Sequence, residues 1–170
     1  MRKMNDYEQG LCEITKLAVT EIRDKKLATK LIKDFVLWKW SERHGKYKGC
    51  KHWSKSAFEQ YETDGDSNLI HEHVIPRKVL ADWLMRKYTN EYVTVEIISG
   101  DLSEFCIGCV LTELEDAAIP KDLNSKMPAD WSKKDPWDRY KGAFQNGIEI
   151  CVVNWDEKNR PRIERTIKIS

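Results

Sequence analysis

Long hydrophobic runs are missing from this sequence, and so is an excess of charge of one sign. No apolar stretch approaches the roughly 20 residues of a membrane-spanning helix, and the first ten residues, MRKMNDYEQG, contain no apolar segment typical of a secretion signal. Lysine plus arginine number 29 against 28 aspartates and glutamates. Net charge therefore provides no attraction to nucleic acid or membrane, and only local clusters can do so. We expect a cytoplasmic protein with no membrane partner.

Cysteine is present but scattered. The five cysteines are an odd number and are widely spaced, unlike the framework of a small disulfide-rich protein, so reduced thiols are expected. Cys106 and Cys109 form a single C-x-x-C pair without a second pair elsewhere. A structural zinc site needs four ligands, so this hypothesis requires Cys50, His52 or Cys151 to lie nearby in the fold. Otherwise the cysteines of FCIGCVL (105–111) are small apolar residues of a strand.

Helical periodicity dominates the first part of the chain. Apolar residues recur at steps of three and four over 7–22 and again after Asp24, a possible N-cap. The second helix is expected to end near Gly45, and its predicted apolar face consists of Leu27, Leu31, Phe35 and Trp38. A short helix is predicted to open at Ser54 or Ser56. The first 62 residues thus form a helical part.

Strands and helices mix in the remainder. Strands are predicted at 69–75, 105–111, 148–155 and 162–169, the last two as a hairpin, and helices at 77–88, at 94–99 closed by Gly100, and at 112–119. Thr112 and Glu115 form a capping box at the start of that last helix. Asp135 and Pro136 are the predicted cap and first position of a helix inside an aromatic lid. The fold class is α+β, in one domain covering 1–170.

The segment NLIHEHVIP (68–76) carries the residues with most chemistry. In a strand His71 and His73 point to one face and Glu72 to the other, but side chains can converge where the strand bends before Pro76. A carboxylate suits Mg²⁺ or Mn²⁺. An imidazole is the natural general base near neutral pH. Together they favour metal-assisted hydrolysis.

EHVIP (72–76) resembles the acidic-His-x-x-Pro signature of the HNH, or ββα-metal, endonucleases, and CVLTELED (109–116) looks like the second strand and helix of that family. The resemblance covers about residues 69–119. It implies a ββα-metal-like core under the helical N-terminal part, with the lid and hairpin in 120–170. It implies that His73 is the general base, assisted by His71, and that Glu72 and Asp116 bind a divalent metal, Mg²⁺ or Mn²⁺ first, Zn²⁺ or Ni²⁺ as alternatives.

The sequence departs from this family at the residue that orients the base. Most HNH sequences have an asparagine or histidine near the start of the second segment, whereas here no asparagine lies between Asn90 and Asn124. Thr112 can replace it only in part. A nucleic-acid-binding module without catalytic activity is therefore an alternative to the endonuclease, and a zinc-stabilised interaction protein is a third hypothesis.

Basic residues cluster in one place. The segment 39–55 has six basic residues and a single acid, interleaved with aromatic side chains that can stack on bases. We expect nucleic acid, DNA rather than RNA, to be bound by Lys46, Lys48 and Lys51, with Arg77 and Lys78 beside the motif. The alternative for this segment is a solvated helix end whose tryptophans pack inward. Likewise His71 and His73 can be silent core residues, and Glu115 and Asp116 can simply complement a helix dipole.

Overall fold

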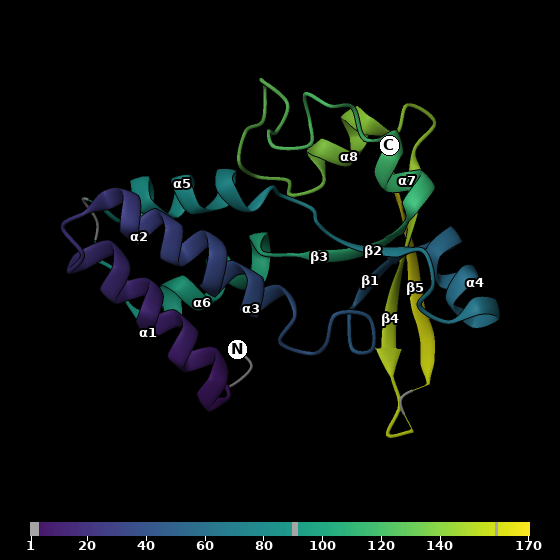
Figure 1. The fold of residues 1–170 in the computed structure, drawn as a ribbon, viewed down its shortest axis with the longest axis horizontal. Coiled ribbons are helices and arrows are strands. Elements are labelled where there is room, and N and C mark those ends of the chain that lie inside the picture. Colours follow the sequence, from purple (N-terminus) through teal and green to yellow (C-terminus); the bar gives the residue numbers. More distant parts are fainter. Residues whose placement is uncertain (1–3, 90–91, 159) are drawn as a thin grey trace.

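The computed structural model describes residues 4–89, 92–158 and 160–170. It confirms the α+β class: helices and a mixed five-stranded sheet (Figure 1). The helical part on the left of Figure 1 consists of α1 (Asp6–Thr20), α2 (Lys25–Leu31), the π-helical segment η1 (Ile32–Val36), α3 (Leu37–Ser41), α5 (Arg77–Tyr88) and α6 (Val95–Phe105). Around the sheet lie α4 (Lys55–Asp64), α7 (Glu113–Ala118) and α8 (Asp138–Ala143).

The predicted caps at Asp24, Ser54 and Thr112 are confirmed, but the predicted start at Asp135 and Pro136 is wrong, since α8 begins at Asp138 after Trp137. Asp24 accepts from the amides of Lys26 and Leu27 at the start of α2, and Ser54 accepts from the Ala57 amide at the start of α4. The Thr112–Glu115 capping box opens α7. Each cap satisfies an amide that the first helical turn leaves without a partner.

The second predicted helix is present, but its predicted apolar face is wrong. Leu27 and Phe35 are 56% and 42% exposed, while Ala28, Ile32, Val36 and Trp40 are buried. Alternative apolar stripes exist on this helix, and contact with α1 and α5 selects the one that packs. The helix also ends at Ser41, before the predicted Gly45. Similarly α6 continues through Gly100 to Phe105, because an isolated glycine costs a packed helix only about 1 kcal/mol.

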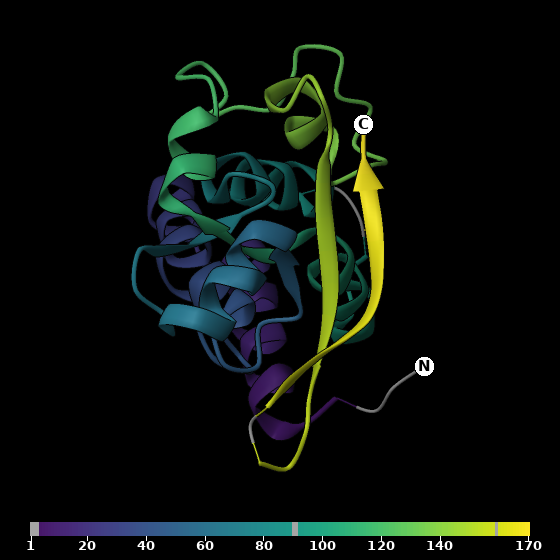
Figure 2. The same ribbon diagram turned by 90° about the vertical axis from the view of Figure 1, so that its right-hand side faces the viewer.

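The sheet has the strand order β2-β3-β1-β4-β5, with bounds β1 (His52–Ser54), β2 (Leu69–His73), β3 (Gly108–Thr112), β4 (Ile148–Trp155) and β5 (Pro161–Ile169). The three-residue β1 was not predicted, because so short a strand has no readable alternation. It pairs parallel with β3 and antiparallel with β4, and so joins two antiparallel pairs. One of these is the predicted hairpin β4–β5, which runs along one side of the molecule (Figure 2).

The core is divided into three clusters of buried side chains. One fills the helical part, a second lies between the sheet and α4, and a third lies on the opposite sheet face under α7 and α8. Neighbouring positions of β3 show the division: Val110 belongs to the α4 side, and Cys109 and Leu111 to the α7–α8 side. The motif strand β2 lies at one edge of the sheet and pairs only with β3 among the described strands.

Candidate functional site

The motif strand β2 forms an antiparallel pair with β3, which leads directly into α7. Glu72 is opposite Cys109 and His73 is opposite Gly108. The succession β2, β3, α7 is thus strand, strand, helix, with α5 and α6 inserted between the two strands. Since β2 is an edge strand, side chains from both of its faces can reach the same open border of the sheet.

The two motif histidines lie together on one face. Their ring centroids are 5.7 Å apart with the rings perpendicular. Nε2 of His73 lies 2.9 Å from Oγ of Ser41, at the end of α3, and the Trp38 ring is 6.1 Å from the His73 ring. Burial, aided by His71 and two nearby arginines, lowers the pKa of His73 to about 3. The imidazole is therefore neutral at pH 7.

His71 has a tighter environment. Burial lowers its pKa to about 4, with a smaller contribution from Lys46. Both of its ring nitrogens are buried, and neither has a hydrogen-bond partner among the other described residues. The ring lies against Gly108, where an added Cβ would be 2.3 Å from Nε2. A glycine at position 108 is thus what makes room for this imidazole.

Glu72 is on the opposite face and forms an ion pair with Arg139 of α8. The Arg139 side chain is fully buried, and it also donates to the carbonyl oxygens of His73, at 2.8 Å, and Leu123, at 3.3 Å. The guanidinium therefore ties the motif strand to the segment that follows α7. Because Arg139 already neutralises the Glu72 carboxylate, a second cation gains little from binding there.

The acidic residues Glu115 and Asp116 of α7 lie in different environments. Glu115 accepts hydrogen bonds from Ser54 Oγ at 2.5 Å and from the amide and hydroxyl of Thr112, so it links α7 to β1. Asp116 is half-buried and does not line the cleft beside Glu72 and His73. Residues 71–73 of the motif thus line one cleft, and Asp116 is not among the residues that line it.

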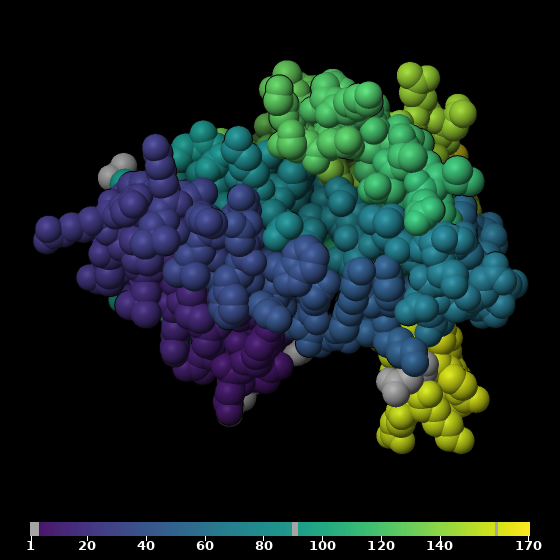
Figure 3. Space-filling model, in the orientation of Figure 1, coloured from purple at the N-terminus to yellow at the C-terminus, as the bar shows by residue number. Residues whose placement is uncertain are grey.

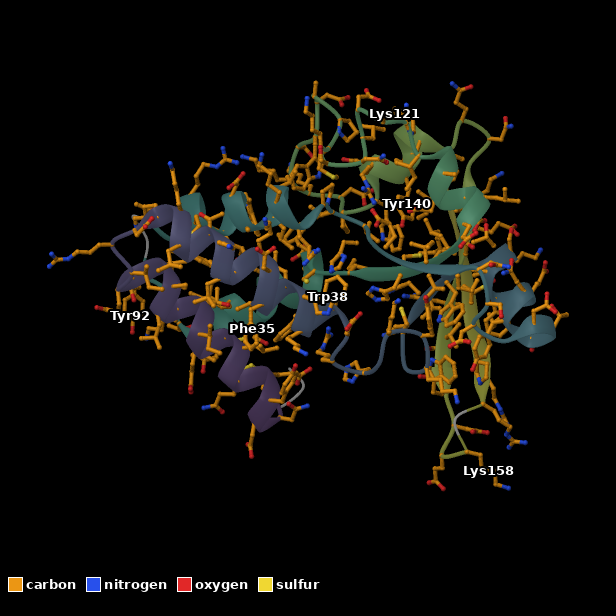
Figure 4. The ribbon with its side chains drawn as sticks, viewed as in Figure 1. Phe35, Trp38, Tyr92, Lys121, Tyr140 and Lys158 are labelled. Carbon is orange, nitrogen blue, oxygen red and sulfur yellow. The ribbon has the colours of Figure 1, made fainter. Side chains whose placement is uncertain are left out.

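A cleft of about 370 Å³ opens at the border of β2. Its walls come from the π-helical turn and α3, from β2, from the start of α5 and from the segment after α7. The lining residues are Lys33, Asp34, Trp38, His71, Glu72, His73, Pro76, Arg77, Lys78, Asn124 and Ser125. Figure 4 shows Trp38 where the helical part meets the sheet. The Arg77 guanidinium lies 4.7 Å from the centre of this ring, so an aromatic surface and fixed positive charge stand beside His73.

The side chains do not fit the divalent metal implied by the family resemblance. Among the described residues no group of three or more histidines, cysteines, aspartates or glutamates is placed to hold a metal ion. Glu72 is engaged by Arg139, and Asp116 lies outside the cleft. The predicted zinc pair is also split: Cys106 packs in the helical cluster and Cys109 under α8. Burial raises the pKa of both thiols, to about 12 for Cys106.

The predicted nucleic-acid contacts are distributed over three hollows. Arg77 and Lys78 line the cleft of His73, as expected. Lys51 lines a neighbouring cavity of about 410 Å³ with Ser41, Arg43 and His52. Lys46 and Lys48 line a third hollow against α4. The basic segment of the sequence is therefore not one continuous surface.

Several residues that contact the motif or line its cleft were not predicted. Ser41, Asn124 and Arg139 reach the motif from distant segments, and single polar residues without a local pattern carry no sequence signal. Trp38 was expected to pack inward but is 38% exposed. Its neighbour Trp40 is 1% exposed, as expected for both. The π-helical segment directly before them changes the phase of the helix, which is a recognised feature near functional sites.

Comparison of the chain with models of protein families, with curated proteins and with solved structures found no significant match. In the described part of the chain, no helix has both the length and the apolar character needed to cross a bilayer. Any functional assignment consequently depends on the residues and the geometry of the cleft.

Proposed function

We propose that this chain is an HNH-like endonuclease, with β2, β3 and α7 as its ββα core and His73 as the general base for hydrolysis of phosphodiester bonds in nucleic acid. The observation that carries the proposal is the position of His73. It lies on the first strand of an antiparallel pair that continues into a helix, and it lines a cleft with Arg77 and Lys78. This position supports the role that the family resemblance assigns to His73.

The chemistry requires a neutral imidazole next to a bound phosphate. Burial keeps His73 unprotonated at pH 7, and its Nε2 is at hydrogen-bond distance from a hydroxyl, that of Ser41. When phosphate enters beside Arg77 and Lys78, its negative charge favours the imidazolium and raises the pKa towards neutrality. His73 then takes a proton from water, the hydroxide adds to phosphorus, and the P–O bond to the leaving oxygen breaks. The leaving oxygen takes up a proton, which the imidazolium returns directly or through water.

No step of this mechanism passes through a metal, because the ligand positions do not support a bound divalent cation. Arg77 and Lys78 provide the positive charge that stabilises the phosphate instead. The cleavage assay therefore varies the added metal ion, Mg²⁺, Mn²⁺, Zn²⁺ or Ni²⁺.

A second candidate function is binding of nucleic acid without cleavage. The Glu72–Arg139 ion pair favours it, because it occupies the carboxylate that the family resemblance assigns to the metal. In this case the cleft retains its phosphate contacts, and His73 is a packed histidine held by Ser41.

The test is cleavage of plasmid DNA and of labelled single strands, with each metal in turn and with EDTA. His73→Ala should lower the rate about 10²- to 10⁴-fold, the usual contribution of a general base. His44→Ala is the matched control, since His44 is exposed and lies outside the cleft. If His73→Ala cleaves as fast as the wild type, the mechanism is wrong. Salt-sensitive binding by the wild type with no cleavage under any condition selects the second candidate.

A further inference from the structure

A fourth hollow, of about 430 Å³, lies between α2 and α5 and adjoins the cleft of His73. It is lined by Lys25, Lys26, Thr29, Lys30, Lys33, Lys78 and Asp82. We call it the lysine groove. Lys33 and Lys78 line both the groove and the cleft, so the two hollows are neighbours. Figures 1 and 3 show α2 and α5 side by side in the upper part of the helical half.

The charges in the groove are largely uncompensated. Five lysines face it with one carboxylate, that of Asp82. Lys33 is paired with Asp34 at 3.3 Å. Lys25, Lys26 and Lys30 are exposed, and none of them forms an ion pair within the described part of the chain. A concave surface with this charge attracts a polyanion.

Helix stability does not explain two of these lysines. Lys25 and Lys26 occupy the first turn of α2, which contains no acidic residue. Positive side chains are unfavourable there because the helix dipole places partial positive charge at its N-terminus. Two lysines beside the Asp24 cap therefore weaken the helix slightly, while they strengthen the positive potential of the groove.

The groove leads to an aromatic side chain. Arg77 donates to the Lys33 carbonyl at 3.3 Å and lies over the Trp38 ring, so it connects the end of the groove with the exposed indole. A positively charged track beside an aromatic ring is the usual combination in proteins that bind single-stranded nucleic acid, where lysines contact phosphates and bases stack.

We propose that the lysine groove binds the backbone of a single-stranded nucleic acid and guides it across α2 and α5 to the cleft of His73. The inference deepens the proposed function and rests on it for the place of cleavage only. It also moves the main phosphate contacts away from the 46–51 segment indicated by the sequence, whose lysines line separate hollows.

The test is binding of a fluorescent single-stranded 20-mer over a series of salt concentrations. The groove variant is Lys25→Ala/Lys26→Ala/Lys30→Ala, which leaves every cleft residue intact. Alanine is the best helix former, so α2 should persist, and circular dichroism and thermal unfolding check this. The matched control, Lys46→Ala/Lys48→Ala/Lys51→Ala, removes the same charge.

Each phosphate contact to a single strand contributes about 0.7 to the slope of log K against log salt. Loss of three contacts should therefore lower the slope by about 2 and weaken binding roughly 100-fold at 0.1 M salt. The control variant should keep most of the wild-type slope. If both variants lose the same affinity and salt slope, or if the control variant loses more, the inference that the groove binds nucleic acid is wrong.

Two further arms separate this inference from its rivals. Vesicles containing anionic lipid are offered to the same variants; binding to vesicles but not to the oligonucleotide overturns the inference in favour of a lipid surface. His73→Ala should retain the wild-type salt slope. If no protein cleaves but the groove variant alone loses binding, the proposed cleavage fails while the groove stands. If the wild type binds no oligonucleotide, both fail.

Discussion

Removal of either partner of the Glu72–Arg139 ion pair should destabilise the fold, and by different amounts. Breaking a buried ion pair costs about 3–5 kcal/mol, because one charge is left without a partner. The Glu72 side chain is 24% exposed and that of Arg139 is 0% exposed. Water can thus reach a lone carboxylate but not a lone guanidinium. We expect a cost of about 3 kcal/mol for Arg139→Met and about 4 kcal/mol for Glu72→Met.

The double variant should cost less than the sum. Two single costs add to about 7 kcal/mol, but residues in direct contact have coupling energies of up to about 3 kcal/mol. With that coupling we expect about 4 kcal/mol for the pair, close to the cost of Arg139→Met alone, because both variants leave the carbonyls of His73 and Leu123 without their donor. Urea unfolding, followed by tryptophan fluorescence, gives the free energy of unfolding of the wild type, both single variants and the double variant. Strict additivity, or a smaller loss in Glu72→Met than in Arg139→Met, would refute the reasoning.

Two further predictions follow from buried rings and close contacts. Burial lowers the pKa of His52, His71 and His73 to about 3–4. Below pH 6.5 the unfolded chain therefore binds more protons than the folded chain. The stability of the fold is complete above that pH and falls below it, by about 2 kcal/mol per histidine at pH 5. Equal urea midpoints at pH 7 and pH 5 would contradict this. Gly108→Ala should destabilise by about 1–3 kcal/mol, because its Cβ meets the His71 ring. Gly100→Ala, with nothing within 4 Å of the added carbon, should stabilise α6 by about 0.5–1 kcal/mol, and the two thermal midpoints should move in opposite directions.

Much of the local structure was predictable because its causes lie within a few residues. The caps at Asp24, Ser54 and Thr112 are short-range hydrogen bonds between a side chain and the next turn. The hairpin 148–169 follows from alternation on both sides of a turn. Where the prediction failed, as for the apolar face of the second helix, more than one stripe satisfied the periodicity, and only packing against α1 and α5 decided between them.

The residues of the cleft were likewise predictable only where the signal is local in the sequence. The motif indicated His71, Glu72 and His73 from their spacing, and the structure brings them to one border of the sheet. Their partners come from far along the chain: Ser41 is 32 residues from His73, and Arg139 is 67 residues from Glu72. A pair so distant leaves no periodic trace in one sequence. The ion pair of Glu72 with the buried Arg139 is such a contact, and the motif did not indicate it.

The amino-acid sequence by itself determined the helices, most strands and the motif strand, because hydrophobic period, capping and turn chemistry act between neighbouring residues. Tertiary structure decided which lysines share a surface, which carboxylate has no ion-pair partner and which aromatic ring is exposed to solvent. Those properties depend on distances between segments far apart in the chain, and burial changes the charge state of a histidine or the partner of a glutamate only after those segments have packed together.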